Sequence, residues 1–279
     1  MIIENRKLKK GQKLNLLACT HIGQPAVSWD GLSKFRKNIM SSGDAWIHLG
    51  DAIEAIIPGD KRFAHGEHEE PLLNQCETFV EWAKPIRKTC WGMLEGNHEQ
   101  VASKTIGNLT KMMCKNAGIP FLAGACAIHI QAKKGTKTGF FAHGSGNINA
   151  RVGPPERRYA NMQVALRAKL QYFEGYLRAM AHMHTAIMAP PTSVNKLSFE
   201  GDGPKLRPTV HDDHWCIAAP SMFKTYDLSD RTNYGEAKLY RPNAIGWIEL
   251  TFEDDATIPE ARFIDQDGRC IKTENEWCF

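Results

Sequence analysis

The sequence predicts an α/β fold in which two β-sheets pack together with helices outside, as a single domain over residues 1–279. Short apolar runs alternate with amphipathic, helix-like segments as far as residue 181, whereas the last third consists mostly of strand-like runs separated by Gly, Pro and Asp turns. The chain has 279 residues, of which 42% are hydrophobic and 24% charged. That composition is typical of a soluble globular protein with a sizeable core.

The predicted elements follow from local pattern. The first 13 residues are lysine-rich and are predicted to form a flexible arm or an edge strand. Helices are predicted where apolar residues recur at helical spacing, as Leu32, Phe35 and Ile39 do, over residues 30–42, 72–84, 102–117 and 162–176. Strands are predicted over residues 14–18, 45–49, 90–94, 125–131, 138–142 and 177–181, and then over 193–199, 215–219, 245–252 and 261–264.

The charge and the cysteines narrow the class of protein. A net charge of +4 is compatible with a nucleic-acid or nucleotide substrate without requiring one. The 8 cysteines contain no CxxC pair, so we expect buried thiols rather than a disulfide framework. No apolar run reaches the roughly 20 residues that span a bilayer, and the first residues lack a signal-peptide core. We therefore expect a cytoplasmic protein that does not contact a membrane.

Polar side chains follow five of the predicted strands. Strand ends of α/β sheets are where ligands bind, so these side chains are expected to share one site. Residues two apart on an extended strand point to the same side, which suits the Cys19/His21 and His182/His184 pairs. The candidates are Cys19, His21, Asp51, Asn97, His98, His143, His182 and His184.

The side chains predict a metal centre. Imidazole suits Mn, Fe, Zn or Co, whereas a magnesium or calcium site would use mostly oxygen. About seven candidate ligands suit two ions better than one, because a structural zinc needs only four. Two ions bridged by one carboxylate form a clamp for phosphoester hydrolysis, and Asp51 is the candidate bridge.

These stretches resemble the ordered motifs of the calcineurin-like metallophosphoesterases, namely D-x-H, G-D, G-N-H-[ED], a lone H and G-H-x-H. The matching segments occur in the same order over about 165 residues, as CTH at 19–21, GD at 50–51, GNHE at 96–99, His143 and AHMH at 181–184. The resemblance implies a four-layer αββα sandwich with two mixed β-sheets flanked by helices.

The resemblance also implies a role for each residue. One divalent ion would be held by Cys19, His21, Asp51 and His184, and the other by Asp51, Asn97, His143 and His182. His98 would stabilise the phosphoryl oxygens or protonate the leaving oxygen, which makes His98 and Asp51 the catalytic candidates. Mn²⁺ is the expected ion, with Zn²⁺ or Fe²⁺ as alternatives.

Two positions depart from the family pattern. Ala181 replaces a usual glycine, which is a small change in backbone freedom. Cys19 stands where the family has aspartate, and a thiolate is a softer ligand that favours zinc or iron over manganese. Three interpretations follow for Cys19: it is a ligand, the first metal site is weak or vacant, or the thiol serves another purpose.

Other polar clusters are weighed against simpler explanations. Arg151, Arg157 and Arg158 lie in a predicted basic loop over residues 149–159 and are candidates for contacting a phosphate or nucleotide. The tract at 65–70 is favoured as a solvated acidic helix start over a metal site. The tract at 211–214 is favoured as a polar turn over a pocket border, and residues 265–268 as a hairpin turn over a calcium loop.

The predicted function is a metal-dependent phosphoesterase. A phosphodiesterase or nuclease acting on DNA, RNA or a nucleotide is favoured by the basic balance and the arginines. The alternatives are a phosphomonoesterase, such as a protein or nucleotide phosphatase, and a catalytically weak binding or scaffold protein in which Cys19 marks a lost metal.

Overall fold

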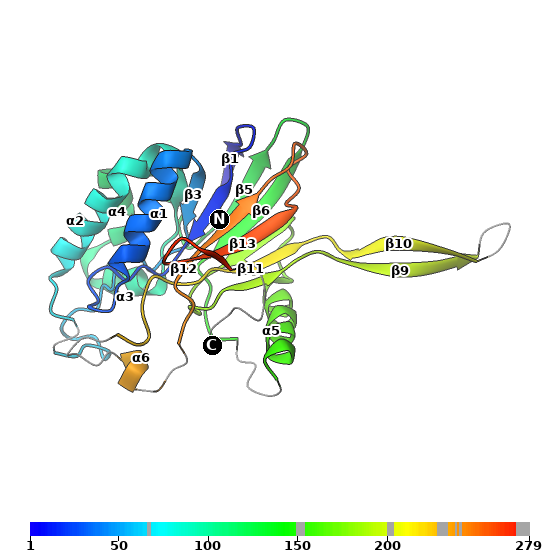
Figure 1. Cartoon of the computed structure of the whole chain (residues 1–279). Helices are drawn as coiled ribbons and strands as arrows, with labels where there is room; N and C mark the ends of the chain where they lie inside the picture. The colour runs from blue at the N-terminus through cyan, green and yellow to red at the C-terminus, as the bar shows by residue number, and fades with distance from the viewer. Residues whose placement is uncertain are drawn as a thin grey trace.

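Two six-stranded mixed sheets form the centre of the molecule (Figure 1). The structure is a computed structural model that describes residues 1–65, 68–148, 154–199, 204–227, 234–237, 239 and 242–271. One sheet has the order β14-β13-β12-β2-β3-β4, and the other has the order β1-β5-β6-β7-β11-β8. In the first sheet β2, β3 and β4 are parallel, and β12 and β13 are antiparallel to their neighbours.

The strands of the first sheet are β2 (Leu14–Leu17), β3 (Ala45–His48), β4 (Cys90–Met93), β12 (Gly246–Thr251), β13 (Glu260–Asp265) and β14 (Cys270–Ile271). Those of the second are β1 (Ile2–Lys7), β5 (Ala125–Gln131), β6 (Thr136–Ala142), β7 (Leu177–Met180), β8 (Ile187–Ala189) and β11 (Trp215–Ala218). The lysine-rich start of the chain is thus an edge strand, because β1 pairs only with β5 at the edge of its sheet.

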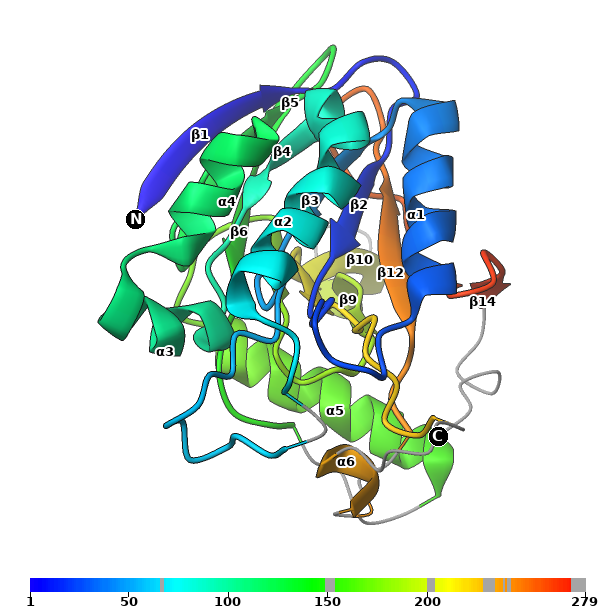
Figure 2. The ribbon, with the colours of Figure 1, turned by 90° about the vertical axis from the view of Figure 1, so that its left-hand side faces the viewer.

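Helices cover the outer face of each sheet. Figure 2 shows α1 (Trp29–Ser42), α2 (Leu72–Ala83) and α4 (Leu109–Ala117) together in front of β2, β3 and β4. The 3-10 helix η1 (Lys84–Thr89) follows α2, and α3 (Asn97–Ile106) precedes α4. On the other side α5 (Pro155–Leu170) packs against β8 and β11, and the short α6 (Tyr234–Ala237) comes late in the chain.

Three apolar layers hold the molecule together. Phe35 of α1, Phe79 of α2 and Trp46 of β3 belong to the layer between the first sheet and its helices. The second layer lies between the two sheets, and the third lies between β7, β11 and α5. Burial of apolar surface is the main favourable term in folding, so these layers fix the two sheets face to face. The predicted αββα arrangement is confirmed.

Several local predictions need correction. The helix predicted over 102–117 is two helices, α3 and α4, because Gly107 ends α3 and the Asn108 side chain caps α4. The helix predicted over 162–176 begins earlier, at Pro155, and ends at Leu170. Proline suits the first turn of a helix, because the N–H that it lacks would have no partner within the helix there. The prediction used apolar spacing alone and therefore placed the start of this helix too late.

The sequence pattern does not predict three strands of the last third, namely β8, β10 (Pro204–Asp212) and β14. β9 (Thr192–Phe199) pairs with β10 in a separate two-stranded antiparallel sheet. The polar turn predicted at 211–214 is therefore partly strand, since 211 and 212 end β10. The hairpin turn predicted at 265–268 is confirmed, because the N–H of Gly268 donates to the Asp265 carbonyl and β13 pairs with β14. None of the described helices has the length and hydropathy that crossing a bilayer needs.

Candidate metal centre at the strand ends

The predicted ligands lie together just beyond the carboxyl ends of β2, β3, β4, β6 and β7. The loops after β2 and β3 continue to pair after the strands end, because Cys19 N–H donates to the Gly50 carbonyl and His21 N–H to the Asp51 carbonyl. This pairing brings Cys19 and His21 beside Asp51. The adjacent strands of the second sheet bring His143 and His182 from the opposite side.

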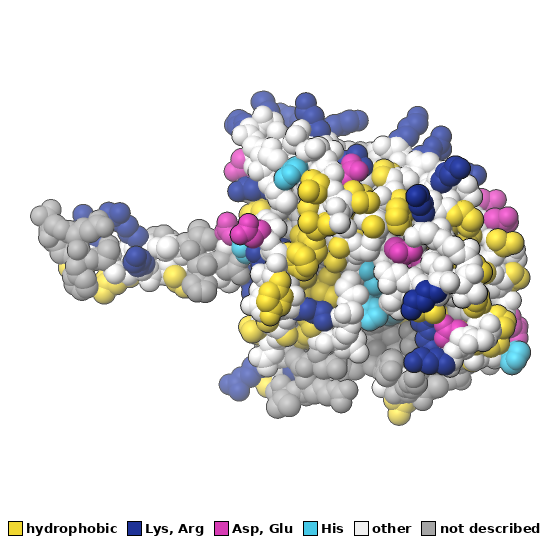
Figure 3. Space-filling model, turned by 180° about the vertical axis from the view of Figure 1, so that it is seen from behind, with side chains coloured by type: hydrophobic (Ala, Val, Ile, Leu, Met, Phe, Trp, Pro, Cys, Tyr) yellow, Lys and Arg dark blue, Asp and Glu magenta, His cyan; other side chains and the backbone are white. Residues whose placement is uncertain are grey.

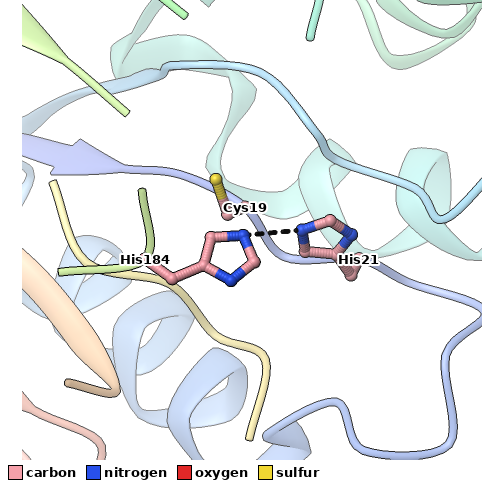
Figure 4. Close-up of side chains that lie close together, drawn as sticks. All are labelled: Cys19, His21 and His184. Carbon is pink, nitrogen blue, oxygen red and sulfur yellow. Dashed lines mark hydrogen bonds between the residues drawn. The ribbon is translucent and has the colours of Figure 1, made fainter. Parts of the chain in front are cut away.

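Cys19, His21 and His184 form the first group of donor atoms (Figure 4). The Nε2 atoms of His21 and His184 lie 3.1 Å apart. Cys19 Sγ also groups with Asp51 and His143, and His21 groups with Asp51 and His98. In each group the potential ligand atoms lie within 4.8 Å of one another. Asp51 belongs to two of the three groups, which places its carboxylate between them.

A second set of contacts converges on Asn97. Its Oδ1 lies 3.0 Å from His143 Nε2 and 2.7 Å from His182 Nδ1. His143 Nε2 also lies 3.0 Å from Asp51 Oδ2. The structure therefore brings all seven predicted ligands and His98 into one cluster. Their assignment to two particular ions stays a prediction.

The outer nitrogens of three histidines are anchored to the protein. His143 Nδ1 bonds to the Leu49 carbonyl at 2.8 Å, and His98 Nδ1 bonds to the Glu54 carbonyl at 2.6 Å. His21 Nδ1 bonds to the Glu54 carboxylate at 2.8 Å. A carbonyl can only accept, so the bonded nitrogens of His143 and His98 carry the proton.

This anchoring tests whether a cation fits the site. With its proton on Nδ1, His143 points Nε2 at two oxygens, Asp51 Oδ2 and Asn97 Oδ1. Burial lowers the pKa of His143, but the charge and hydrogen bond of Asp51 outweigh it and raise that pKa, which favours a proton on Nε2 in metal-free protein. A divalent ion among these atoms would take the place of that proton. Histidine ligands of metals commonly donate their other N–H to a carboxylate or carbonyl in this way. The donor set of imidazoles, carboxylate, amide oxygen and thiol fits a transition-metal ion.

Burial and neighbouring charges shift the pKa values of the cluster. Burial alone would raise the pKa of Asp51, but the charge and hydrogen bond of His143 outweigh it and lower that pKa well below the usual range. Burial, with His21 beside it, lowers the pKa of His184 well below its ordinary value. The carboxylate is thus ionised and His184 is neutral, which are the states that bind a metal.

Cys19 is fully buried, and its pKa is raised well above the usual value by burial and by the charge of Asp51. A raised pKa disfavours the thiolate, which is the form that ligates. A divalent cation among the donors would reverse this balance, because a coordinating thiol is deprotonated.

Two glutamates support the cluster, and the sequence pattern did not assign either of them a role. The Glu99 carboxylate accepts from the backbone N–H groups of Asp51, Ala52, Ile53 and Gly96, which joins the loops after β3 and β4. Glu54 lies between His21 and His98. Glu54 follows Asp51 by only three residues, and this closeness in sequence is the signal that could have identified it.

Burial would raise the pKa of Glu54, but the surrounding side chains of His98, His21 and His68 outweigh burial. The pKa of Glu54 is therefore lowered overall. Burial would lower the pKa of His21, but the hydrogen bond and charge of Glu54 raise it overall. His68 is buried, with its Nε2 3.4 Å from Glu54 Oε1. The solvated helix start predicted for the tract at 65–70 is therefore wrong for His68, and α2 begins only at Leu72; residues 66 and 67 lie outside the described part.

The predicted arginines are not connected to the cluster by the hydrogen bonds and ion pairs of the described residues. Arg157 is exposed and Arg158 is partly exposed, both on the first turn of α5 rather than in a loop. The loop prediction was wrong because it extended the Gly/Pro-rich stretch too far. Arg151 lies outside the described residues.

Arg62 is a cation near the cluster that the sequence did not reveal. Its Nε and Nη2 bond to the two carboxylate oxygens of Asp60 at 3.1 and 2.8 Å. That hydrogen bonding is the largest cause of its raised pKa, and the charges of Glu54 and Asp51 raise it further. Phe63, the next residue, contacts the His68 ring with centroids 5.9 Å apart.

The loop after β11 closes the cluster from another side. Met222 N–H donates to the Cys19 carbonyl, which links residues about 200 positions apart. The Phe223 ring lies 5.7 Å from the His21 ring and 5.9 Å from the His184 ring, measured between centroids. Phe223 is itself buried, so its ring covers one side of these two imidazoles.

Comparisons with known proteins give distant similarities. Neither a protein-family model nor a curated protein matches this sequence. Among solved structures, Yfce, a phosphoesterase from E. coli, aligns over 91% of this chain and 100% of its own, with 12% identity and a TM-score of 0.40. A metallophosphoesterase from Sphaerobacter thermophilus aligns over 88% of this chain and 85% of its own, with 11% identity and a TM-score of 0.34. The function proposed below depends on the side chains of this chain.

Proposed function

We propose that the protein is a metal-dependent phosphoester hydrolase that acts on a phosphodiester of nucleic acid or a nucleotide. The observation that carries the proposal is the central Asp51 carboxylate, shared by two groups of donor atoms. A shared carboxylate is the arrangement that two-metal sites use. Two divalent ions bound there would neutralise the phosphoryl charge and activate the attacking water.

The chain's own residues would orient the substrate and handle protons. His98 is buried and T-shaped against His21, with its Nδ1 proton directed to the Glu54 carbonyl and its Nε2 left for the substrate. Asp51 Oδ1 accepts a hydrogen bond from the backbone N–H of His98. The carboxylate proposed to bind metal therefore also positions the residue proposed to contact the substrate. Burial lowers the pKa of His98, whereas the negative charge of a bound phosphate would favour its protonated form. In that form His98 would stabilise a phosphoryl oxygen or give its proton to the leaving oxygen.

Arg62 supports an anionic substrate. Asp60 holds its guanidinium in a planar, bidentate arrangement, and its side chain remains about one third exposed. A preorganised guanidinium loses little side-chain entropy when it binds a phosphate. The predicted contacts of Arg151, Arg157 and Arg158 with substrate stay a proposal.

Turnover of two chromogenic esters tests the proposal. Bis-p-nitrophenyl phosphate is a diester and p-nitrophenyl phosphate is a monoester, and each would be assayed with Mn²⁺, Zn²⁺ and Fe²⁺. We expect the diester to be preferred. Preference for the monoester would support the phosphatase alternative, and no turnover with any ion would support the binding-protein alternative.

Asp51→Asn is the matching variant. We expect it to lower kcat by more than about 100-fold, because even disturbing a group behind a metal ligand costs 10- to 100-fold. Asp30→Asn, at an exposed position on α1, is the control and should retain activity. Turnover near the wild-type rate in Asp51→Asn would exclude the shared-carboxylate site.

A further inference from the structure

The ribbon formed by β9 and β10 belongs to neither six-stranded sheet and projects from the body (Figures 1 and 3). The described side chains at 192–197 and 204–207 are all exposed. A two-stranded ribbon without a packed face is marginally stable in water. The ribbon therefore adds little to the core, and its described side chains lie on the surface.

The register gives the ribbon two different faces. Leu197 pairs with Leu206 on one face, where they are 55% and 64% exposed. Lys196 pairs with Arg207 on the other face, and the Lys205 position shares that face because side chains alternate along a strand. The leucine pair gives the ribbon a cross-strand apolar contact of its own, and the opposite face carries three cations.

The basic face fits a polyanion. The Lys196–Arg207 pairing puts two cations directly opposite each other on an exposed pair of strands. A row of phosphates carries the complementary charge. Eight residues of strand extend about 27 Å, and the major groove of a duplex admits a two-stranded ribbon.

We propose that the basic face of the ribbon, formed by Lys196, Lys205 and Arg207, binds the phosphate backbone of a nucleic-acid duplex. This proposal rests on the proposed function, since it assigns the substrate class of that site. The chain has a net charge of +4, so electrostatics favour nucleic acid over a second copy of the same protein. The acidic residues of the tip sequence, Glu200 and Asp202, lie outside the described residues, and the proposed contact is confined to the strands.

Neutralising the basic face provides the first test. The triple variant Lys196→Gln, Lys205→Gln, Arg207→Gln would be compared with the wild type by fluorescence anisotropy of a short labelled DNA duplex at several salt concentrations. We expect weaker binding and a shallower salt dependence, with the slope of log K reduced by about 0.9 for each phosphate that the variant no longer neutralises.

A matched control separates this face from net charge. Lys34→Gln, Lys37→Gln, Lys111→Gln removes the same charge from exposed positions on α1 and α4. The proposal is overturned if both triple variants weaken binding equally, or if neither does. It is also overturned if sedimentation shows a wild-type dimer that the ribbon variant dissociates, because the ribbon would then join two copies.

Deleting the ribbon separates binding from catalysis. β8 and β11 are antiparallel neighbours with Ala189 opposite Cys216, so a short glycine turn can replace residues 192–213. We expect duplex binding to disappear and turnover of bis-p-nitrophenyl phosphate to stay within about twofold of the wild type. Retained duplex binding overturns the ribbon proposal. Ribbon-dependent binding in a wild type that hydrolyses no ester supports the ribbon proposal while contradicting the proposed function.

Discussion

At the residue scale, the candidate metal centre depends on histidines whose outer nitrogens are fixed. The inner nitrogen of His143 faces Asp51 and Asn97, and that of His21 faces His184. His143, His98 and His21 are held in this way by the Leu49 carbonyl and by Glu54. The side-chain entropy lost in fixing these rings is therefore lost on folding, before a ligand binds. The groups are thus preorganised for a cation or a phosphate.

Cys19 tests whether a softer ligand limits the site. We expect Cys19→Asp to preserve or raise turnover of bis-p-nitrophenyl phosphate with Mn²⁺, because carboxylate oxygen suits manganese better than sulfur does. The backbone also tolerates the change, since Cys19 has φ +48° and aspartate is enriched in that region. Assays with Mn²⁺ and Zn²⁺ in wild type, Cys19→Asp and Cys19→Ser would check this. Complete loss of activity in Cys19→Asp would mean that the thiol itself is required.

The His21–Glu54 pair predicts a pH-dependent stability in metal-free protein. The raised pKa of His21 adds stability that is fully present below about pH 6.5 and is lost as pH rises through the raised value. The lowered pKa of Glu54 adds stability that is present above about pH 4.3 and is lost as pH falls through the lowered value. The pair therefore stabilises the fold most between these limits.

Glu54→Gln should consequently destabilise the EDTA-treated protein more at pH 6 than at pH 9. The expected difference from wild type at pH 6 is about 1–3 kcal/mol, the cost of removing a partner from a buried hydrogen bond. Thermal unfolding at both pH values would measure it, with the exposed Glu81→Gln as the control. An equal effect at the two pH values would contradict the ion-pair explanation.

At the element scale, the loops after the strands place the site residues in an unusual backbone conformation. Among the described residues, nine non-glycine residues have positive φ, and five of them are predicted site residues, namely Cys19, His21, Asp51, His182 and His184. Such conformations cost of order 1–3 kcal/mol each and persist where surrounding contacts enforce them. The paired loops after β2 and β3 provide those contacts for Cys19, His21 and Asp51.

At Gly96 the loop after β4 lies directly against Asp51 in the loop after β3. A Cβ at this position would lie 2.1 Å from the Asp51 backbone nitrogen and from Asp51 Oδ1. Gly96→Ala should therefore displace Asp51, lower stability by about 1–3 kcal/mol and abolish turnover. Gly124→Ala is the control, because its Cβ would meet only the end of the Gln100 side chain at 3.3 Å. Normal activity in Gly96→Ala would show that the Asp51 position is not critical.

At the scale of the whole molecule, two sheets packed face to face bring strand ends from distant parts of the chain to one edge. His21 and His184 are 163 residues apart in sequence, yet their nitrogens lie 3.1 Å from each other. The apolar layer between the sheets maintains this approach. Disturbing the cluster should therefore lower the thermal stability of the whole fold.

Metal removal is the corresponding prediction. A ligand present at 100 times its Kd stabilises the folded state by about 2.7 kcal/mol, which for a chain of 279 residues corresponds to a Tm change of roughly 5 °C. We expect EDTA to lower Tm by about this amount and to abolish ester hydrolysis, and added Mn²⁺ to restore both. Calorimetry with and without the chelator checks this. An unchanged Tm would argue against a bound ion at the cluster.

Local sequence pattern is enough to predict the layered α/β architecture and the identity of the clustered side chains. Both follow from local pattern: apolar periodicity for the elements, and polar residues immediately after strands for Cys19, His21, Asp51, Asn97, His98, His143, His182 and His184. Such patterns are readable because neighbours in sequence share one element. The break between α3 and α4 was missed because the apolar spacing continues across Gly107.

The groups that support the site, and the ribbon that projects from the body, become apparent only when the chain is folded. Glu54, His68 and Arg62 join the cluster through loops whose paths depend on packing, so no periodicity identifies them. The ribbon of β9 and β10 was half predicted, because the β10 sequence alternates too weakly to stand out before it is paired. A residue's role in such places depends on contacts between distant segments, and those contacts form only when the layers pack.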